Sequence, residues 1–316
     1  MPPARLVVVA DPIDGPSIER LRGGPCEVVD SSADPSALAG PLGDAWGLIV
    51  RSRTKVTAEL IEKAPRLELV ARAGVGVDNI DLKATGARGI RVVNAPAAAT
   101  DSVAELTVAL YLLLVRGLYP SLVATKAGKW ERGTHGQELA GKTVGFVGYG
   151  RIAREVARRL VPFGARTVAF DPFVPRSGDG TEMLPLAVLL ARADIVSIHA
   201  ALTPENRHLV DGRALAMMPK GSYLVNVARG ALVDEAALLA ALQSGHLAGA
   251  ALDVFETEPP TRTELLAHPH LLATPHLGAS TEEAQRRAGS ETVDEVLRAL
   301  RGEPLHALVP AAGGAR

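Results

Sequence analysis

Short apolar runs alternate with segments of helical spacing in two separate stretches of this 316-residue chain. The first stretch holds the runs 6–10, 27–29, 47–50, 67–71 and 91–93, and the second begins at Lys142 with the runs 143–147 and 167–170. Alternation of this kind is typical of βαβ units in a parallel sheet. The pattern predicts an α/β protein with two sequential parallel-sheet domains, joined by one long helix over residues 102–126.

Composition supports buried sheets and excludes several classes of partner. Only 3% of the residues are aromatic, so Ala, Val, Leu and Ile must build the core, which suits buried parallel strands. The 34 Lys and Arg against 35 Asp and Glu leave a formal net charge of -1 and no basic field for nucleic acid or an anionic membrane. The longest apolar run, 106–115, is about half a membrane span. The single Cys26 cannot form an internal disulfide. We therefore expect a cytoplasmic protein that binds neither nucleic acid nor a membrane.

A glycine-rich turn with the sequence GYGRIA at 148–153 separates an apolar run from a helical segment. Gly148 and Gly150 would let the backbone approach a pyrophosphate, which the free N–H groups of a helix N-terminus favour. Asp171 lies 18 residues beyond Ala153, close to the spacing of about 20 at which a carboxylate meets the ribose hydroxyls. This spacing predicts NAD rather than NADP as the cofactor, and Arg176 nearby is the one feature against that preference. The alternative is a tight turn without a ligand, with Asp171 as a turn residue before Pro172.

Five blocks of residues follow one another along the chain: RAGVGVDN at 72–79, GYGRIAR at 148–154, NVARGALVDE at 226–235, LDVFETEP at 252–259 and PHLGAST at 275–281. Together they resemble the D-isomer-specific 2-hydroxyacid dehydrogenases, from about residue 5 to about residue 305. The resemblance implies two Rossmann- or flavodoxin-like domains. An NAD-binding domain, 96–278, would be inserted into a substrate-binding domain made of 1–95 and 279–316. It also implies a homodimer acting on a small 2-hydroxy or 2-oxo acid.

Oxidation of a hydroxy acid requires a base for the hydroxyl proton, a cation for the carboxylate and a group that orients the base. His276 follows the apolar run 271–273, so it occupies a turn at a strand end, where α/β sheets place ligands. Its imidazole titrates near neutral pH and can exchange a proton. Arg229 presents a planar fork that suits a carboxylate. The resemblance assigns His276 and Arg229 to catalysis.

Three acids, Asp253, Glu256 and Glu258, crowd one loop, and their spacing does not decide which of them contacts the histidine. By resemblance the catalytic partner of His276 is Glu258, which would stabilise the imidazolium, while Asp253 would contact the nicotinamide. Glu256 is expected to be a solvated side chain.

The remaining site residues also come from the resemblance, and none of them implies a metal. The cofactor-binding set is Gly148, Gly150, Arg151, Ile152, Asp171, His199, Val227, Ala228, Asp253, Gly278 and Ala279. Gly74 and Gly76, around Val75, would let backbone N–H groups reach the substrate carboxylate, with Val75 and Gly76 as substrate-binding residues.

Arg51 and Arg53 stand at alternate positions after the apolar run 47–50, an arrangement that suits a phosphate. This segment resembles phosphoglycerate dehydrogenases, as does 128–132, in which an arginine like Arg132 can reach the partner subunit's active site. A solvated basic turn is the alternative. Against the phosphate, the segment 100–102 resembles glyoxylate and hydroxypyruvate reductases.

The first hypothesis is therefore NAD-dependent interconversion of D-3-phosphoglycerate and 3-phosphohydroxypyruvate, which enters serine biosynthesis. The alternative is a hydroxypyruvate or glyoxylate reductase, or another D-2-hydroxyacid dehydrogenase. A remote alternative is an NAD-sensing scaffold similar to the corepressors that share this fold. The chain ends near the expected last helix, so we expect a short form without a C-terminal regulatory domain.

Overall fold

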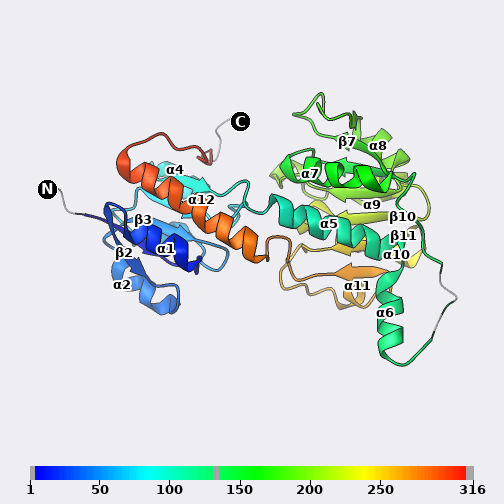
Figure 1. The fold of residues 1–316 in the computed structure, drawn as a ribbon, viewed down its shortest axis with the longest axis horizontal. Coiled ribbons are helices and arrows are strands. Elements are labelled where there is room, and N and C mark those ends of the chain that lie inside the picture. Colours follow the sequence, from blue (N-terminus) through cyan, green and yellow to red (C-terminus); the bar gives the residue numbers. More distant parts are fainter. Residues whose placement is uncertain (1–3, 131, 133–134, 311–316) are drawn as a thin grey trace. The chain divides into compact units, whose positions relative to one another are not determined.

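The computed structural model describes residues 4–130, 132 and 135–310. It divides the chain into two compact units (Figure 1). Unit 1 consists of Met1–Ala99 and Ser280–Arg316, and unit 2 of Thr100–Ala279. Unit 2 is thus inserted into unit 1, whereas the alternation of apolar runs alone predicts two sequential domains. The boundaries expected from the resemblance, after residues 95 and 278, lie close to these.

Unit 1 contains a five-stranded parallel sheet in the order β2-β1-β3-β4-β5. Its strands are β1 (Arg5–Val9), β2 (Cys26–Asp30), β3 (Ala45–Val50), β4 (Leu69–Arg72) and β5 (Arg91–Asn94). This is the strand order of flavodoxin-like folds. Because successive side chains of a strand point to opposite faces, Val7 and Val9 join one core cluster and Val8 joins the other.

The helices of unit 1 cover both faces of this sheet. Residues of α1 (Gly15–Arg22) and α12 (Glu282–Arg301) pack into the cluster with Val7 and Val9. The opposite cluster takes residues from η1 (Pro35–Leu38), α2 (Ala39–Leu42), α3 (Ala58–Glu62) and α4 (Leu82–Ala87). Helix α12 begins at the cap Thr281, whose hydroxyl accepts the Ala284 N–H, and ends at the left-handed Gly302. The end of the chain therefore completes the core of the first domain.

Unit 2 contains a seven-stranded parallel sheet in the order β12-β11-β10-β9-β6-β7-β8. The strands are β6 (Thr143–Val147), β7 (Arg166–Phe170), β8 (Glu182–Met183), β9 (Ile195–Ile198), β10 (Ser222–Asn226), β11 (Leu247–Leu252) and β12 (Leu271–Ala273). Taken in chain order, this is the Rossmann order 3-2-1-4-5-6 with a seventh strand at the edge. The strand order reverses between β6 and β9, the point at which such sheets bind nucleotides.

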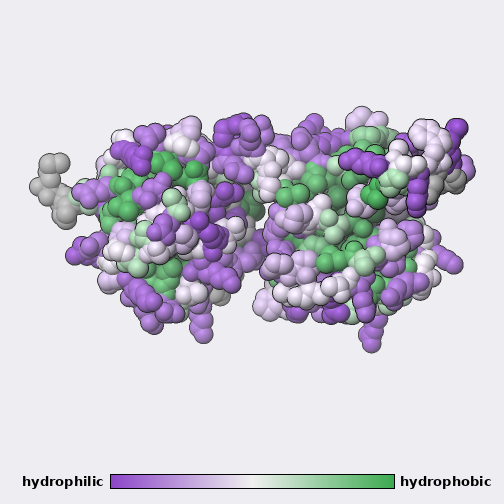
Figure 2. Space-filling view, turned by 90° about the horizontal axis from the view of Figure 1, so that it is seen from below, coloured by the Kyte–Doolittle hydropathy of each residue, from purple (hydrophilic) through white to green (hydrophobic). Residues whose placement is uncertain are grey.

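The helices of unit 2 pack on its sheet, and one core cluster joins the strands to α8 (Leu186–Arg192), α9 (Gly212–Met217), α10 (Glu235–Gln243) and α11 (Thr263–Leu266). Helix α5 (Thr100–Val115) contacts β10, β11 and α7 (Arg151–Leu160). Three short 3-10 turns complete the unit: η2 (Val161–Phe163), η3 (Pro204–Asn206) and η4 (Gly230–Leu232). On the face drawn in Figure 2, hydrophobic residues gather in the middle of each unit and hydrophilic residues surround them.

The expected long helix over 102–126 is wrong in one respect, because the structure breaks it into α5 and α6 (Leu118–Lys126). Gly117 adopts a left-handed conformation with φ 57° between them, and the two axes differ by 74°. The Gly136 backbone packs against Arg116 so closely that an added Cβ would lie 2.6 Å from the Arg116 Cα. This packing lies directly beside the break. Among the described residues, no single helix is long and apolar enough to cross a membrane. Helices α5 and α6 reach that length and apolar composition only when taken together, as this bent pair.

Candidate active site

The predicted site residues of unit 2 lie on turns that follow the carboxyl ends of its parallel strands. Since parallel strands end at a common edge, these turns form a row in the order of the sheet. From β12 to β7 the row reads His276, Glu258, Arg229, His199, Gly148 and Asp171. The proton-transfer candidates and the nucleotide-binding candidates therefore occupy opposite halves of one row.

The glycine turn after β6 has the backbone that a bound phosphate requires. Gly148 has φ 88°, and a Cβ there would lie 2.6 Å from the Ala200 backbone nitrogen, so only glycine fits without displacement. Gly150 is the N-cap of α7, makes no side-chain cap, and has open space where a Cβ would stand. The first turn of α7, which includes Arg151 and Ile152, therefore keeps its N–H groups for an anion.

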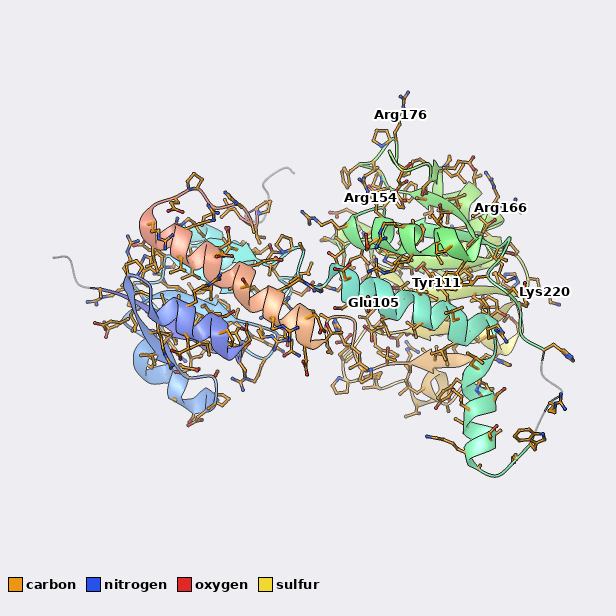
Figure 3. All side chains as sticks on the ribbon, in the orientation of Figure 1. Glu105, Tyr111, Arg154, Arg166, Arg176 and Lys220 are labelled. Carbon is orange, nitrogen blue, oxygen red and sulfur yellow. The ribbon has the colours of Figure 1, made fainter. Side chains whose placement is uncertain are left out.

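Asp171 follows β7 beside the glycine turn. One carboxylate oxygen accepts the Tyr149 N–H at 2.8 Å and the other accepts the Phe173 N–H at 2.8 Å. A carboxylate has about four acceptor positions, so two remain for the hydroxyls of a ribose. Arg176, the residue that argues for a 2′-phosphate, is exposed and points away from the unit (Figure 3). The arrangement around Asp171 fits NAD.

Tyr149, whose role the sequence does not indicate, anchors the loop beyond Asp171. Its hydroxyl lies 2.7 Å from the Asp179 carboxylate and 2.7 Å from the Thr181 hydroxyl, and its ring is fully buried. Burial raises the pKa of this phenol well above its usual range. Tyr149 thereby connects the glycine turn to the loop that carries Asp171. In the sequence, the feature that could have pointed to this role is an aromatic residue placed between two glycines of the turn.

His199 follows β9, next to the glycine turn across the switch point. Its Nε2 lies 2.8 Å from the Ser197 hydroxyl, and its Nδ1 is buried with no partner among the described residues. Burial lowers the pKa of His199 to about 3, so the ring is neutral near pH 7. A buried nitrogen without a partner beside the glycine turn is what a polar group of a dinucleotide would satisfy.

His276 and Glu258 form the central pair of the site. The His276 Nδ1 lies 2.9 Å from the Glu258 Oε2, and Glu258 Oε1 accepts the Phe255 N–H at 3.2 Å. An ionised carboxylate only accepts, so Nδ1 carries the proton and Nε2 is the nitrogen left to exchange one with a ligand. His276 has φ 55°, a rare conformation for a residue with a side chain. Its N–H donates to Asp253 O at 2.9 Å, which helps to hold the backbone there.

Arg229 lies on the turn after β10, held by two neighbours. The buried Asn226 side chain donates to the Arg229 carbonyl at 2.9 Å and accepts the Ala228 N–H at 3.0 Å. A Cβ on Gly230 would lie 1.8 Å from the carbonyl carbon of Phe255, so these two backbones touch. The turn of Arg229 and the loop of Glu258 are therefore packed directly together. Val227 and Ala228 lie on the same turn.

Asp253 is 1% exposed and braces the turn that carries His276. Its carboxylate accepts hydrogen bonds from the Thr274 hydroxyl at 2.6 Å, the Leu277 N–H at 2.7 Å and the Gly278 N–H at 2.8 Å. Ala279, beside Gly278, is exposed. Asp253 thus fixes the turn that holds His276, and its contact with a nicotinamide stays a prediction. Within the described ranges no group of three or more His, Cys, Asp or Glu side chains could hold a metal ion.

In unit 1, the loop after β4 presents two backbone donors. The Gly74 N–H is already bonded to the Arg72 carbonyl at 2.8 Å, whereas no described residue accepts the N–H of Val75 or Gly76. The Asn94 side chain donates to the Val75 carbonyl at 2.6 Å and holds the loop. Of the predicted backbone donors, Val75 and Gly76 remain for a carboxylate and Gly74 does not.

The arginines after β3 differ from the expected phosphate-binding pair. Arg53 contacts Asp11 at 3.2 Å and donates to the carbonyls of Ala10 and Ser32, both at 2.8 Å. Burial acts to raise the pKa of Asp11, but hydrogen bonds from Thr54 and Arg51 and the charge of Arg53 lower it overall. The charge of Arg53 is therefore offset within unit 1 by the buried Asp11, a partner that the local sequence did not reveal.

Two further arginines complete the set of predicted cations. Among the described residues, the Arg51 side chain contacts only the Pro12 carbonyl, at 3.4 Å, so Arg51 is the more available of the pair after β3. Arg132 is exposed, between residues outside the described parts of the chain.

The expectation that Glu256 is simply solvated is wrong. Its side chain is 17% exposed and contacts Arg207 and His208, each at 3.0 Å. Both partners lie in the loop after β9, nearly fifty residues away in the sequence, so no local pattern revealed them.

Comparison with known proteins places this geometry in a family. Residues 108–278 match the NAD-binding domain of the D-isomer-specific 2-hydroxyacid dehydrogenases. The D-3-phosphoglycerate dehydrogenase of Methanocaldococcus jannaschii is 43% identical over 303 residues, which cover 94% of this chain and 58% of that protein. The hydroxypyruvate reductase of Thermotoga maritima is 42% identical over 299 residues, which cover 93% of this chain and 98% of that protein.

A solved structure from Thermus thermophilus superposes with a TM-score of 0.88 at 37% identity, covering 96% of this chain and 100% of that one. The chain thus spans little more than half of the phosphoglycerate dehydrogenase and nearly all of the two other proteins. It belongs to the D-isomer-specific 2-hydroxyacid dehydrogenase family, and residues 108–278 match that family's NAD-binding domain.

Proposed function

We propose that the protein is an NAD-dependent dehydrogenase that interconverts D-3-phosphoglycerate and 3-phosphohydroxypyruvate, the step that enters serine biosynthesis. The observation that carries the dehydrogenase activity is the 2.9 Å contact between His276 Nδ1 and Glu258 Oε2, beside the turn of Arg229. This contact leaves Nε2 of the imidazole to exchange a proton. Arg229, whose Nη1 donates to the Ala228 carbonyl at 2.7 Å, brings a cation to the turn beside the Glu258 loop, so the two kinds of group that hydroxy-acid oxidation requires lie in one row of turns.

In the oxidation direction, NAD held at the glycine turn of Gly148 and Gly150 and at Asp171 would supply the hydride acceptor for C2 of the substrate. His276 Nε2 accepts the proton of the C2 hydroxyl, and Glu258 stabilises the imidazolium that results. Arg229 holds the substrate carboxylate and the oxygen that becomes the carbonyl. We propose the N–H groups of Val75 and Gly76 as further donors to the carboxylate. In reduction, the same proton returns from His276.

The phosphate of the proposed substrate is supported by the name of the Methanocaldococcus jannaschii relative and by Arg51. Arg51 keeps most of its guanidinium uncommitted within the described part of unit 1. A dianionic phosphate favours such a donor through charge-assisted hydrogen bonds.

The second candidate is a hydroxypyruvate reductase, favoured by the state of Arg53. Its guanidinium is bound to Asp11 and two carbonyls, so one of the two cations expected for a phosphate is neutralised. The Thermotoga maritima relative, which carries that name, is matched over almost its whole length.

Helix α6 supports a further proposal, that the protein is a homodimer. Four of its nine residues are apolar and exposed: Leu118 by 37%, Tyr119 by 52%, Leu122 by 56% and Val123 by 50%. Contiguous apolar surface of this kind marks an interaction site, and most soluble oligomers are homo-oligomers, C2 dimers above all. A Leu122→Glu variant is expected to shift the mass measured by light scattering toward the monomer; an unchanged mass contradicts this role for α6.

A substrate panel with both cofactors tests the proposed function. Initial rates are measured in the reduction direction with phosphohydroxypyruvate, hydroxypyruvate and glyoxylate, each with NADH and with NADPH. We expect the highest kcat/KM with phosphohydroxypyruvate and NADH. A higher kcat/KM for hydroxypyruvate would replace the first candidate with the second. The absence of turnover with every acid would contradict both.

A further inference from the structure

A second histidine–glutamate pair lies in the loop that carries Glu258, two residues before it. Glu256 Oε2 is 3.0 Å from His208 Nε2 and 3.0 Å from Arg207 Nη2. Burial acts to raise the pKa of Glu256, but these two partners and the N–H of Glu235 lower it overall, so the side chain is ionised near neutral pH. The carboxylate thus ties its loop to the loop after β9.

Glu235, at the start of α10, extends the contact to a third loop. The Glu235 N–H donates to Glu256 Oε1 at 3.1 Å, and the Glu256 N–H donates to Glu235 Oε1 at 2.7 Å. This reciprocal pair of bonds joins the two backbones through their own side chains. Arg262 lies 3.5 Å from the other Glu235 oxygen and offsets the second buried carboxylate.

The same loops are also joined through their backbones. His208 donates to the Ala231 carbonyl at 2.8 Å and Val210 donates to the Leu232 carbonyl at 2.9 Å, which connects the loop after β9 to the turn of Arg229. Gly230 touches the peptide between Phe255 and Glu256. The loops after β9, β10 and β11 therefore meet at Glu256.

His208 adopts φ 53°, a left-handed conformation that is unfavourable for a residue with a Cβ. Its contact with Glu256 and its bond to Ala231 hold it there. Backbone strain of this kind persists only where the surroundings determine it, and it clusters at functional sites. Here it lies in the loop that supports the turn of Arg229 and the loop of Glu258.

We propose that Glu256 is a positioning residue of this enzyme, which binds His208, Arg207 and the Glu235 N–H and so holds the Arg229 turn against the loop of Glu258. It touches neither His276 nor the atoms that react. Its effect on turnover rests on the proposed dehydrogenase function, whereas its effect on the geometry of the Glu258–His276 pair does not.

The test compares three variants that remove the contact in different ways. Glu256→Ala removes every bond of the carboxylate. Glu256→Gln keeps an acceptor for the Glu235 N–H and removes the charge. His208→Asn removes the imidazole and keeps a residue type that tolerates the left-handed backbone. Glu182→Gln is the matched control, because Glu182 pairs with Arg192 at 3.1 Å on the surface of the same unit.

The first readout is the proton on His276 Nδ1, observed by NMR in the enzyme labelled with ¹⁵N-histidine and free of substrate. The signal is assigned by its loss in His276→Asn. We expect it to shift or disappear in Glu256→Ala, to move less in Glu256→Gln, and to stay unchanged in Glu182→Gln. Because no substrate is present, this result does not depend on which acid the enzyme oxidises.

The second readout is steady-state turnover at saturating NAD and a temperature at which every variant is folded by circular dichroism. We expect kcat to fall by about 10-fold to 100-fold in Glu256→Ala, since a misplacement of about 1 Å can cost 100-fold. His208→Asn should lose less, and Glu256→Gln should recover part of the loss. A folded Glu256→Ala enzyme with an unchanged His276 signal and a kcat within twofold of the wild type would overturn the proposal.

Discussion

Gly230→Ala tests whether the packing of the Arg229 turn against the Glu258 loop controls catalysis. A Cβ at position 230 would lie 1.8 Å from the Phe255 carbonyl carbon, 2.0 Å from its oxygen and 2.4 Å from the Glu256 nitrogen. Ordinary contact begins at 3.4 Å, so the two backbones must separate by about 1.6 Å. Overpacking of this kind destabilises a protein by about 1–3 kcal/mol.

The loss of activity should exceed what the loss of stability suggests. A displacement above 1 Å between groups that act together costs about 100-fold, or about 2.7 kcal/mol in the barrier, so kcat/KM should fall at least that far. The assay follows NADH at saturating cofactor, and the Kd for NAD is measured separately because Val227 and Ala228 lie on the displaced turn.

Gly212→Ala is the matched control for Gly230→Ala. A Cβ there would meet only the Ala237 Cβ, at 3.7 Å, which is an ordinary contact. That variant should keep its activity and gain up to about 1 kcal/mol of stability. Loss of less than twofold in kcat/KM for Gly230→Ala would refute the reasoning.

Three further predictions concern single side chains. His276→Asn keeps a residue that tolerates the left-handed backbone and should lower kcat by about 100-fold to 10,000-fold; near-normal turnover would remove His276 as the base. Arg51→Ala should raise the KM for phosphohydroxypyruvate by about 10-fold with little change in Tm. Arg53→Ala should lower Tm, because it removes the cationic partner of the buried Asp11, which then keeps only its hydrogen bonds from Thr54 and the Arg51 N–H among the described residues; the reverse pattern in thermal melts and kinetics would exchange the roles of the two arginines. Burial lowers the pKa of His199 from 6.5 to about 3. Between these two pH values the imidazole is protonated in the unfolded chain and neutral in the folded one. The free energy of unfolding should therefore fall as pH drops below 6.5, by at most about 1.4 kcal/mol per pH unit. A His199→Gln variant with the same pH dependence in urea unfolding would contradict that source.

Much of the fold follows from local patterns, because apolar alternation alone predicts the α/β class. Periodicity could not assign α12 to the first sheet, since an amphipathic helix can cover any apolar face; that assignment came from the family resemblance. The break after Val115 was missed for another reason. The break lies at the left-handed Gly117, and the Gly136 backbone packs there against Arg116, a contact between segments about twenty residues apart.

The residues of the candidate site also divide into those that the sequence predicts and those that it does not. The glycines of the turn after β6 are predictable because the backbone itself demands them, as the positive φ of Gly148 illustrates. Glu256 was misjudged because a charged side chain in a loop is usually solvated, and the ion pair of Arg53 was not foreseen. Both instead have buried or distant partners, Asp11 and His208, that only the folded chain brings to them.

The turns in the row along the sheet of unit 2 are spaced at the regular interval of the strands that carry them, and this spacing fixes how far apart the groups that contact a ligand lie. Neighbouring strands lie about 4.8 Å apart, and the backbone hydrogen bonds of the sheet hold that interval constant. A substitution in a turn that is not packed directly against its neighbour therefore leaves the spacing of the strand ends that carry the other turns as it was. Such a scaffold allows the acid that is oxidised to change over evolution while the cofactor keeps its place.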